Sequence, residues 1–303
     1  AIDGFFRNYD LDNYYEDNNT ILDIYSENPD GQDPYNFTPF NDECGNYSGE
    51  GDCYNKEHII PKSVFNENTP MQGDAHSLLP TDGRVNGFRG NFPMGRVDNN
   101  NLASQSGISN PTQNGSKLGD NLNSGYSSGY SGTVFEPIDE FKGDIARIHF
   151  YFATRYQNQI SNWSSYAMFN GSSDQVFETV FLNILLEWHN LDPVSQKEID
   201  RNDAIYYDHQ GNRNPFVDHP EWVEEIYGNP VSQNFTLSNS KIAGEYILFD
   251  LKSAGAGRYQ LLKSSDLINW TLVDDFETFT GIHQIKRHLF ETQCFFQVKH
   301  YLD

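Results

Sequence analysis

An acidic residue and a histidine stand side by side at Glu57-His58, and an asparagine, Asn86, follows in a short polar stretch. A carboxylate and an amide oxygen suit a hard cation such as Mg²⁺, which keeps its other positions for water and substrate phosphate. A neutral imidazole beside that cation suits a general base for water. Arg84 and Arg89 lie close by in the sequence, and cationic side chains stabilise an anion that gains charge as it reacts. The combination indicates a metal-assisted phosphodiesterase site.

Each of these residues also has an ordinary structural interpretation. A Glu-His pair is common, His76 could be a hydrogen-bonded histidine of the core, and Asn86-Gly87 could be a simple turn. The chemical interpretation is favoured because all of them fall within a short span that contains few apolar residues.

The elements that must position these side chains can be predicted locally. Residues 53–60 read as a strand that ends before Pro61, so the Glu57 and His58 side chains should point to opposite faces. Residues 77–79 read as a second short strand. We expect a helix to follow with Thr81 as its N-cap, which places Asn86 about one turn into the helix. The sequence therefore predicts a strand–strand–helix order around these three side chains.

The chain resembles the bacterial endonuclease I family, secreted nonspecific nucleases with a His-Me finger (ββα-metal) site. The resemblance rests on several sequence blocks that follow the family order across most of residues 20–228. These blocks are YNKEHIIPKS at 54–63, PMQGDAH at 70–76, PTDGRVNGFRGNFPMG at 80–95, FEPIDEFKGDIARIHFYFATRY at 135–156 and WHNLDPVSQKEIDRNDAIYYDHQGNRNPFVDHPEWVEEIYG at 188–228.

The resemblance implies a role for each matching position. His58 falls on the family's general base, and Glu57 and Asn86 fall on its metal ligands. Some members supply a phosphate-binding arginine from a long insertion between the histidine and the asparagine, which this chain lacks. Arg89 is our first candidate to replace that arginine, followed by Arg84 and Arg213.

Further expectations follow from the same resemblance. His76, Lys62 and Arg213 are candidate substrate contacts. The substrates implied are DNA and RNA, bound without sequence specificity and cut by a one-metal mechanism that leaves 5′-phosphate ends. The cofactor implied is Mg²⁺, with Mn²⁺ or Ca²⁺ able to occupy the site. We expect a monomer that is secreted or periplasmic.

Composition sets limits on these expectations. The chain has 303 residues, 15% of them aromatic, and a formal net charge of −23, which is unusual for a protein that binds a polyanion. High salt would mute long-range repulsion, because the Debye length falls to about 3 Å at 1 M, so the charge favours a salt-tolerant enzyme. No apolar run approaches the roughly 20 residues that span a bilayer, and we expect no membrane insertion.

The periodicity of apolar residues changes along the chain and predicts an α+β protein with two domains. Helices are expected over about 138–156 and 174–189, then from an Asp192 cap with Pro193 at N1 to about residue 208, and over 220–227. Residues 98–133 are rich in Asn, Ser and Gly and suggest a surface loop or hairpins. We predict a catalytic domain over 1–228 and a small all-β accessory domain of four or five strands over 229–303.

The N-terminal region carries two further signals. Residues 21–25 read as a short buried strand, and the Asp-rich residues 10–17 could hold Ca²⁺, although a solvated loop is favoured. Cys44 and Cys53 lie in one Gly-rich loop, and in an oxidising compartment we expect a disulfide between them.

A second function class stays open at this stage. A noncatalytic extracellular binding or adhesion module would also suit the acidic, aromatic surface and the C-terminal β segment. The joint presence of Glu57, His58 and Asn86 argues against it.

Overall fold

The computed structural model describes residues 2–174 and 176–228 and, beyond them, six strands within residues 235–301. The chain divides into two compact units, Ala1–Tyr227 and Gly228–Asp303. Whether the two are independent folding domains, as the sequence predicts with a boundary after Gly228, stays a prediction.

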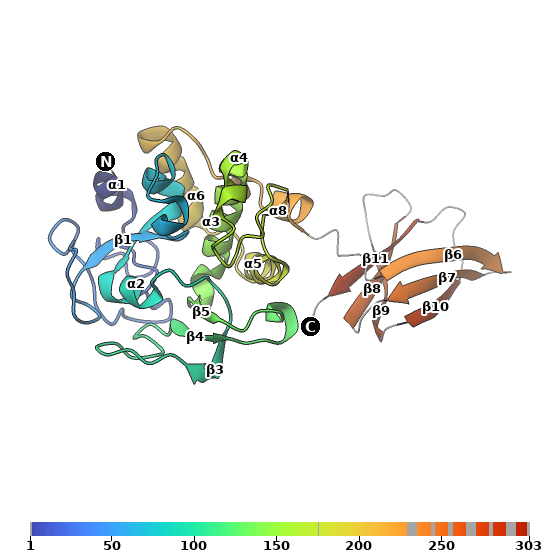
Figure 1. Ribbon diagram of the computed structural model, residues 1–303. Coiled ribbons are helices and arrows are strands. Elements are labelled where there is room, and N and C mark those ends of the chain that lie inside the picture. Colours follow the sequence, from blue (N-terminus) through green and yellow to red (C-terminus); the bar gives the residue numbers. More distant parts are fainter. Residues whose placement is uncertain are drawn as a thin grey trace. The chain divides into compact units, whose positions relative to one another are not determined.

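The first unit mixes helices with small antiparallel sheets, so the predicted α+β class is confirmed (Figure 1). Its strands are β1 (Tyr54–His58), β2 (Leu78–Asp82), β3 (Val97–Leu102), β4 (Lys117–Asn121) and β5 (Thr133–Glu136). Its α-helices among the described residues are α1 (Ile2–Tyr9), α2 (Gly83–Arg89), α3 (Lys142–Arg155), α4 (Gln157–Ile160), α5 (Thr179–Leu191), α6 (Gln196–Ala204), α7 (Pro215–Asp218) and α8 (Glu221–Ile226).

The predicted strand–strand–helix unit is present as β1, β2 and α2. The two strands pair antiparallel, with Tyr54 opposite Asp82 and His58 opposite Leu78. The helix begins one residue later than predicted: Asp82, not Thr81, is the N-cap, and its carboxylate accepts a hydrogen bond from the Val85 amide at 2.7 Å. Thr81 instead pairs with Asn55 in the ladder, which holds its backbone in the strand.

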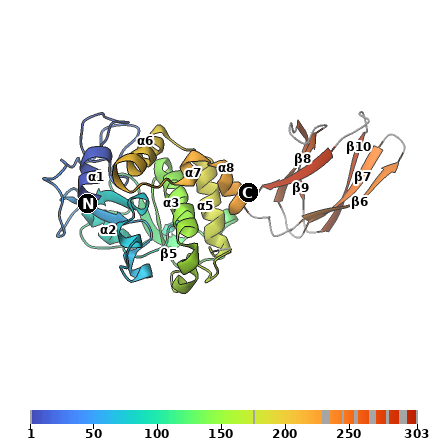
Figure 2. The same cartoon turned by 90° about the horizontal axis from the view of Figure 1, so that it is seen from above.

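The core of the first unit lies around α3, which contacts α5 along its length (Figures 1 and 2). Apolar residues recur at three- and four-residue steps along α3, and nearly all of the helix is buried. Even Arg147 is buried, because its guanidinium forms a two-pronged ion pair with Glu198 of α6 at 2.6 and 2.7 Å. This pair joins α3 to the helices that follow it.

Several predicted boundaries in the first unit were wrong. The third predicted helix begins after Ser195, where a capping box with Glu198 forms, and not at Asp192. Asp192 instead accepts a hydrogen bond from the Gly143 amide at the start of α3, at 2.7 Å. Residues 21–25 are buried as predicted but form a bridge and a turn, not a strand. Helix α1 was not predicted.

Residues 97–136 form the three-stranded sheet β3–β4–β5, which agrees with the hairpins suggested by the sequence. Its tyrosines have packing partners: Tyr126 lies under the Arg96 guanidinium, and Tyr130 contacts the Phe181 ring at 4.9 Å between centroids.

The second unit contains β6 (Phe235–Ala243), β7 (Tyr246–Ser253), β8 (Gly257–Ser264), β9 (Thr271–Thr278), β10 (Gly281–His288) and β11 (Phe295–Tyr301). They form two antiparallel sheets with strand orders β10–β7–β6 and β11–β8–β9. The prediction of strands was therefore right, but it missed β6. In the described parts of both units, no helix combines the length and the apolar character needed to cross a membrane.

A buried histidine in α3 should make the first unit sensitive to acid. His149 is almost fully buried, and burial is the main cause that lowers the pKa of its imidazole to about 4. In the unfolded chain the imidazole takes up a proton near pH 6.5. Stability is therefore lost as the pH falls from about 6.5 towards 4.

We expect His149→Leu to reduce this acid sensitivity. Between pH 7 and 4, the variant should lose about 1–3 kcal/mol less unfolding free energy than the parent. Urea denaturation followed by helical circular dichroism measures this difference. His219→Leu, which changes an exposed histidine, is the matched control, and equal pH slopes for the parent and His149→Leu would contradict the expectation.

Candidate active site

The side chain of Glu57 points from β1 into the protein towards α2. It is buried, and its Oε1 accepts hydrogen bonds from the Tyr25 hydroxyl at 2.8 Å and from Arg89 Nη1 at 2.9 Å. Burial raises the pKa of this carboxyl group, and the Arg89 charge acts in the opposite direction. Both bonds end on the same oxygen, so Oε2 is the oxygen through which Glu57 could bind a cation.

Arg89 lies behind Glu57 at the end of α2. Only 1% of it is exposed. Besides Glu57, its guanidinium donates to three backbone carbonyls, those of His58, Ile59 and Phe92, at 2.7–3.1 Å. The phosphate contact expected from the sequence needs an accessible guanidinium, whereas this one is enclosed and makes four hydrogen bonds within the protein. The geometry supports a positioning role for Arg89.

Asn86 lies three residues before Arg89 on the same face of α2. Its amide nitrogen donates to the Asn55 side chain at 2.8 Å and to the Lys56 carbonyl at 3.2 Å. These two bonds use both amide hydrogens, so they fix the side chain with Oδ1 as its remaining acceptor. Asn55 and Glu57 stand two positions apart on β1, which puts them on one face of the strand beside α2.

His58 turns away from Glu57, as the alternation along a strand predicts. Its ring contacts Phe65, and Nε2 lies 3.1 Å from the carbonyl oxygen of Gln72. A carbonyl can only accept, so Nε2 carries the proton of the neutral ring and Nδ1 keeps a lone pair. Burial lowers the pKa of this imidazole. The neutral ring of His58 can therefore accept a proton through Nδ1.

The donor set fits a hard divalent cation. Glu57 Oε2 and Asn86 Oδ1 offer oxygen donors, and both belong to side chains whose other polar atoms are fixed by hydrogen bonds. Mg²⁺ prefers such ligands and usually binds through only one or two protein groups. The residues present thus fit the metal that the resemblance implies.

The other predicted site residues lie in different surroundings. Lys62 has 51% of its side chain exposed, pairs with Glu67 at 3.2 Å, and carries a charge that contributes to lowering the pKa of His58. Arg84 is buried and donates to the Ser106 carbonyl. Of these two residues, Lys62 is therefore the one that lies on the surface beside His58.

Arg213 and His76 have structural partners. Arg213 is held between Asp203 and Asp218 at 2.6 and 2.7 Å. His76 is buried, its Nε2 contacts the Asn212 carbonyl, and burial is the main cause that lowers the pKa of its imidazole to about 4. These contacts give both residues a role in the fold without any substrate.

Sequence reasoning missed three groups that hold the site: Tyr25, Asn55 and the carbonyl of Gln72. Asn55 could have been found, because it stands at i−2 from Glu57 on the predicted strand. Tyr25 lies 32 residues from Glu57, and no local pattern connects the two. A backbone carbonyl has no sequence signal at all.

The predicted disulfide between Cys44 and Cys53 is present and closes a loop directly before β1. This loop packs onto α2 through Tyr47. A methyl group added to Gly87 would lie only 3.0 Å from the Tyr47 ring carbon Cζ, so the glycine permits this close approach. The loop also donates the Gly51 amide to Asp82 at 2.8 Å. It thereby supports the helix that carries Asn86 and Arg89.

The fold and site define an α+β protein with a strand–strand–helix centre that presents a glutamate, a histidine and an asparagine. A model of the endonuclease I family matches residues 2–221, and the chain belongs to this family, as the sequence predicted. The extracellular ribonuclease of Bacillus amyloliquefaciens is 37% identical over 183 residues, which are 57% of this chain and 54% of that protein. The extracellular ribonuclease of Bacillus subtilis (strain 168) is 34% identical over 183 residues, with the same shares covered. The chain spans about half the length of these relatives.

The buried pair of Arg89 and Glu57 leads to a stability prediction. Arg89→Met should destabilise the first unit by about 3–5 kcal/mol, because it leaves the Glu57 carboxylate buried without its counter-charge. Adding Glu57→Gln should recover part of this loss. Urea denaturation of the parent, both single variants and the double variant measures the coupling.

Arg213→Met provides the matched control, since its ion pairs are partly exposed and should cost about 1 kcal/mol or less. If Arg89→Met were as stable as Arg213→Met, the buried pair would not hold the site together.

Proposed function

We propose that this chain is a secreted, metal-dependent nuclease that hydrolyses phosphodiester bonds without sequence specificity. The observation that carries the proposal is the fixed orientation of His58 and Asn86. The Gln72 carbonyl leaves Nδ1 of His58 as a proton acceptor, and Asn55 with the Lys56 carbonyl leaves Oδ1 of Asn86 as a ligand. Membership of the endonuclease I family supports the same chemistry.

His58 would act as the general base. Its Nδ1 takes a proton from the water that attacks phosphorus, and the lowered pKa keeps the ring neutral and able to accept that proton. The Gln72 carbonyl holds the tautomer throughout. A divalent cation bound by Glu57 and Asn86 would stabilise the negative charge that develops on the phosphate and on the leaving oxygen. The family resemblance implies 5′-phosphate ends.

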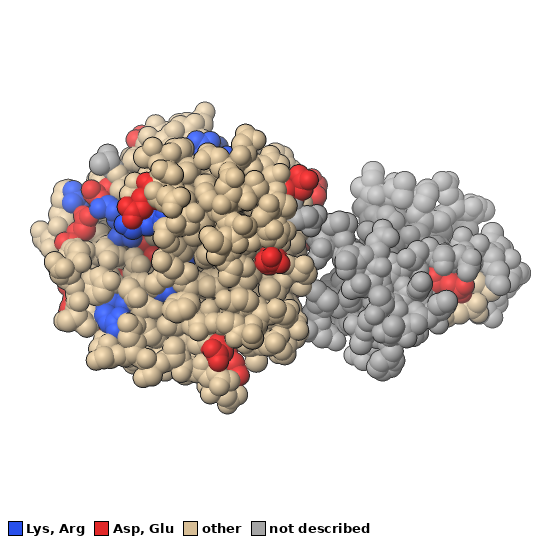
Figure 3. Space-filling model, viewed as in Figure 1, with Lys and Arg blue, Asp and Glu red and all other residues tan. Residues whose placement is uncertain are grey.

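Lys62 is the best placed of the predicted cationic side chains to contact the phosphate. It is exposed and close enough to His58 for its charge to affect the pKa of the imidazole. Basic side chains on the face shown in Figure 3 gather mainly over the region of β1 and α2, among acidic ones. A local basic site on an acidic body would bind a nucleic acid backbone without reading its bases.

RNA and DNA are both proposed substrates. The two curated relatives are named extracellular ribonucleases, which supports RNA and an extracellular location. The resemblance supports DNA as well. The proposed site engages the phosphate through a base and a cation, which is chemistry that the two nucleic acids share.

Digestion of supercoiled plasmid and of a structured RNA tests the proposal. We expect cleavage of both with Mg²⁺, and none with EDTA. The rate should persist into high salt, because a chain with a net charge of −23 gains from the screening of long-range repulsion. A rate that drops steeply between low and moderate salt would contradict the salt-tolerant enzyme. Absence of cleavage under all conditions would favour a binding module.

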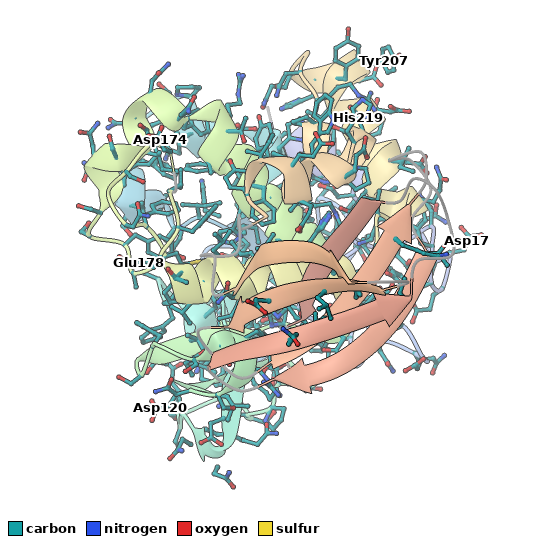
Figure 4. The ribbon with its side chains drawn as sticks, turned by 90° about the vertical axis from the view of Figure 1, so that its right-hand side faces the viewer. Asp17, Asp120, Asp174, Glu178, Tyr207 and His219 are labelled. Atoms are coloured by element: carbon teal, nitrogen blue, oxygen red, sulfur yellow. A yellow bond between two sulfur atoms is a disulfide. The ribbon has the colours of Figure 1, made fainter. Side chains whose placement is uncertain are left out.

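A single substitution tests the general base. His58→Ala should lower the cleavage rate by about 10²–10⁴-fold and leave the melting temperature close to that of the parent, since the imidazole is partly exposed. His219→Ala removes an exposed histidine between α7 and α8 (Figure 4) and should keep the parent rate. A folded His58→Ala protein with full activity would exclude His58 as the base.

A further inference from the structure

Three acidic side chains converge in the N-terminal region, away from the Glu57 site. The sequence favoured a solvated loop over residues 10–17, but the structure buries part of it. Asp12 is 0% exposed, Glu27 is 1% exposed and Glu16 is half-buried. One carboxylate oxygen from each of the three lies within 4.8 Å of the others. Such a convergence needs a compensating partner.

Glu27 is the unusual member of this cluster. Both of its carboxylate oxygens are buried, and neither has a hydrogen-bond partner among the described residues. Oε2 of Glu16 is also buried without a partner there, while its Oε1 accepts the Asp33 amide at 3.0 Å. An unpaired carboxylate in such a site is costly. The unsatisfied oxygens therefore belong to two of the three converging side chains, Glu16 and Glu27.

The surrounding charges increase this cost. Burial is the largest cause that raises the pKa of Glu27 to about 9, and the carboxylates of Asp33, Asp12, Glu16 and Asp23 add to it. The charged side chains that act most strongly on Glu27 are thus carboxylates, and a bound cation would compensate their charge.

The other members of the cluster are already oriented. The Asp12 carboxylate accepts the Tyr15 amide at 3.0 Å and the Glu16 amide at 3.1 Å. Asp33 accepts the Asn28 amide through Oδ1 at 2.7 Å, which leaves Oδ2 available. These backbone bonds fix the carboxylates. Asp12 Oδ2 keeps a second lone pair and Asp33 keeps its second oxygen, and both are open to a ligand.

We propose that Asp12, Glu16 and Glu27, with Asp33 at the edge, bind a structural Ca²⁺ ion. The donor set consists of oxygen alone, without histidine or cysteine, which excludes a typical zinc site. Ca²⁺ accepts six to eight oxygen ligands in irregular geometry and tolerates several carboxylates, whereas Mg²⁺ demands a near-ideal octahedron and retains waters. The site is separate from the proposed active site and does not depend on its function.

The proposed ion would hold the turn that supports Glu57. The Glu27 amide donates to the Asp23 carbonyl at 2.8 Å. The Asp23 side chain in turn accepts the amides of Tyr25 and Asp82 at 2.8 and 2.7 Å. The Tyr25 hydroxyl in turn donates a hydrogen bond to Glu57 Oε1. Ordering of the Glu27 turn is therefore connected to β1 and to the N-terminus of α2.

Thermal unfolding of the full chain tests this site. The Asn86→Ala background weakens any contribution from the proposed active-site ion. After removal of bound metal, Ca²⁺ at about 100 times its Kd should raise the melting temperature by about 5–10 °C, and Mg²⁺ at the same ionic strength should raise it much less. Equilibrium dialysis with radioactive Ca²⁺ should find one ion per chain. Absence of both effects would overturn the proposal.

Variants assign the effect to the cluster. In the same background, Glu27→Gln should remove the Ca²⁺-dependent shift and the bound ion, and its melting temperature without Ca²⁺ should equal or exceed that of the background. Asp120→Asn removes one exposed carboxylate on β4 and should keep the full shift. In Figure 4, Asp120 lies far from Asp17, which belongs to the Asp-rich residues 10–17 of the cluster region. Retention of the shift in Glu27→Gln would refute the site. If Glu27→Gln does not fold, Glu16→Gln must lose most of the shift.

Discussion

The candidate site depends on the buried ion pair between Glu57 and Arg89. Arginine keeps its charge in proteins, so Arg89 offsets the burial of the carboxylate while its other donors fix the carbonyls at the end of β1. The pair also has an electrostatic consequence for the metal. Glu57, Arg89 and Asn86 together carry no net charge, so a cation bound there would find its compensating charge mainly on a substrate phosphate. Metal and substrate binding would then support each other.

The same arrangement explains why α2 has a fixed position on β1. Asn55 and Glu57, two residues apart on the strand, bond to Asn86 and Arg89, three residues apart on the helix. The spacing of a strand face thus matches that of a helix face at two adjacent points. Tyr47 and the disulfide loop cover the helix from outside. The contact between β1 and α2 therefore fixes the positions of the proposed ligands Glu57 and Asn86.

The sequence could predict features that depend on neighbours along the chain. The opposite directions of Glu57 and His58, the strand–strand–helix order and the disulfide all follow from local spacing or from the family resemblance. Helix starts were less predictable, because two good caps competed. Asp192 precedes a proline and looks like an N-cap, but its carboxylate bonds to Gly143 of α3, and Ser195 caps the helix instead. Both residues are suitable N-caps by local sequence. The contact of Asp192 with the distant Gly143 determines that Ser195 takes this position.

The net charge of −23 is less of an obstacle to phosphate binding than it first appears. The exposed basic groups near the site already have acidic partners: Lys62 pairs with Glu67, and Lys56 pairs with Asp3 and Glu43. An exposed pair of this kind is worth about 0–1 kcal/mol, so Lys62 can exchange Glu67 for a phosphate at little cost. Salt weakens the long-range repulsion more than it weakens such a short contact. A strongly acidic protein can therefore keep a working cationic contact where the chemistry needs one.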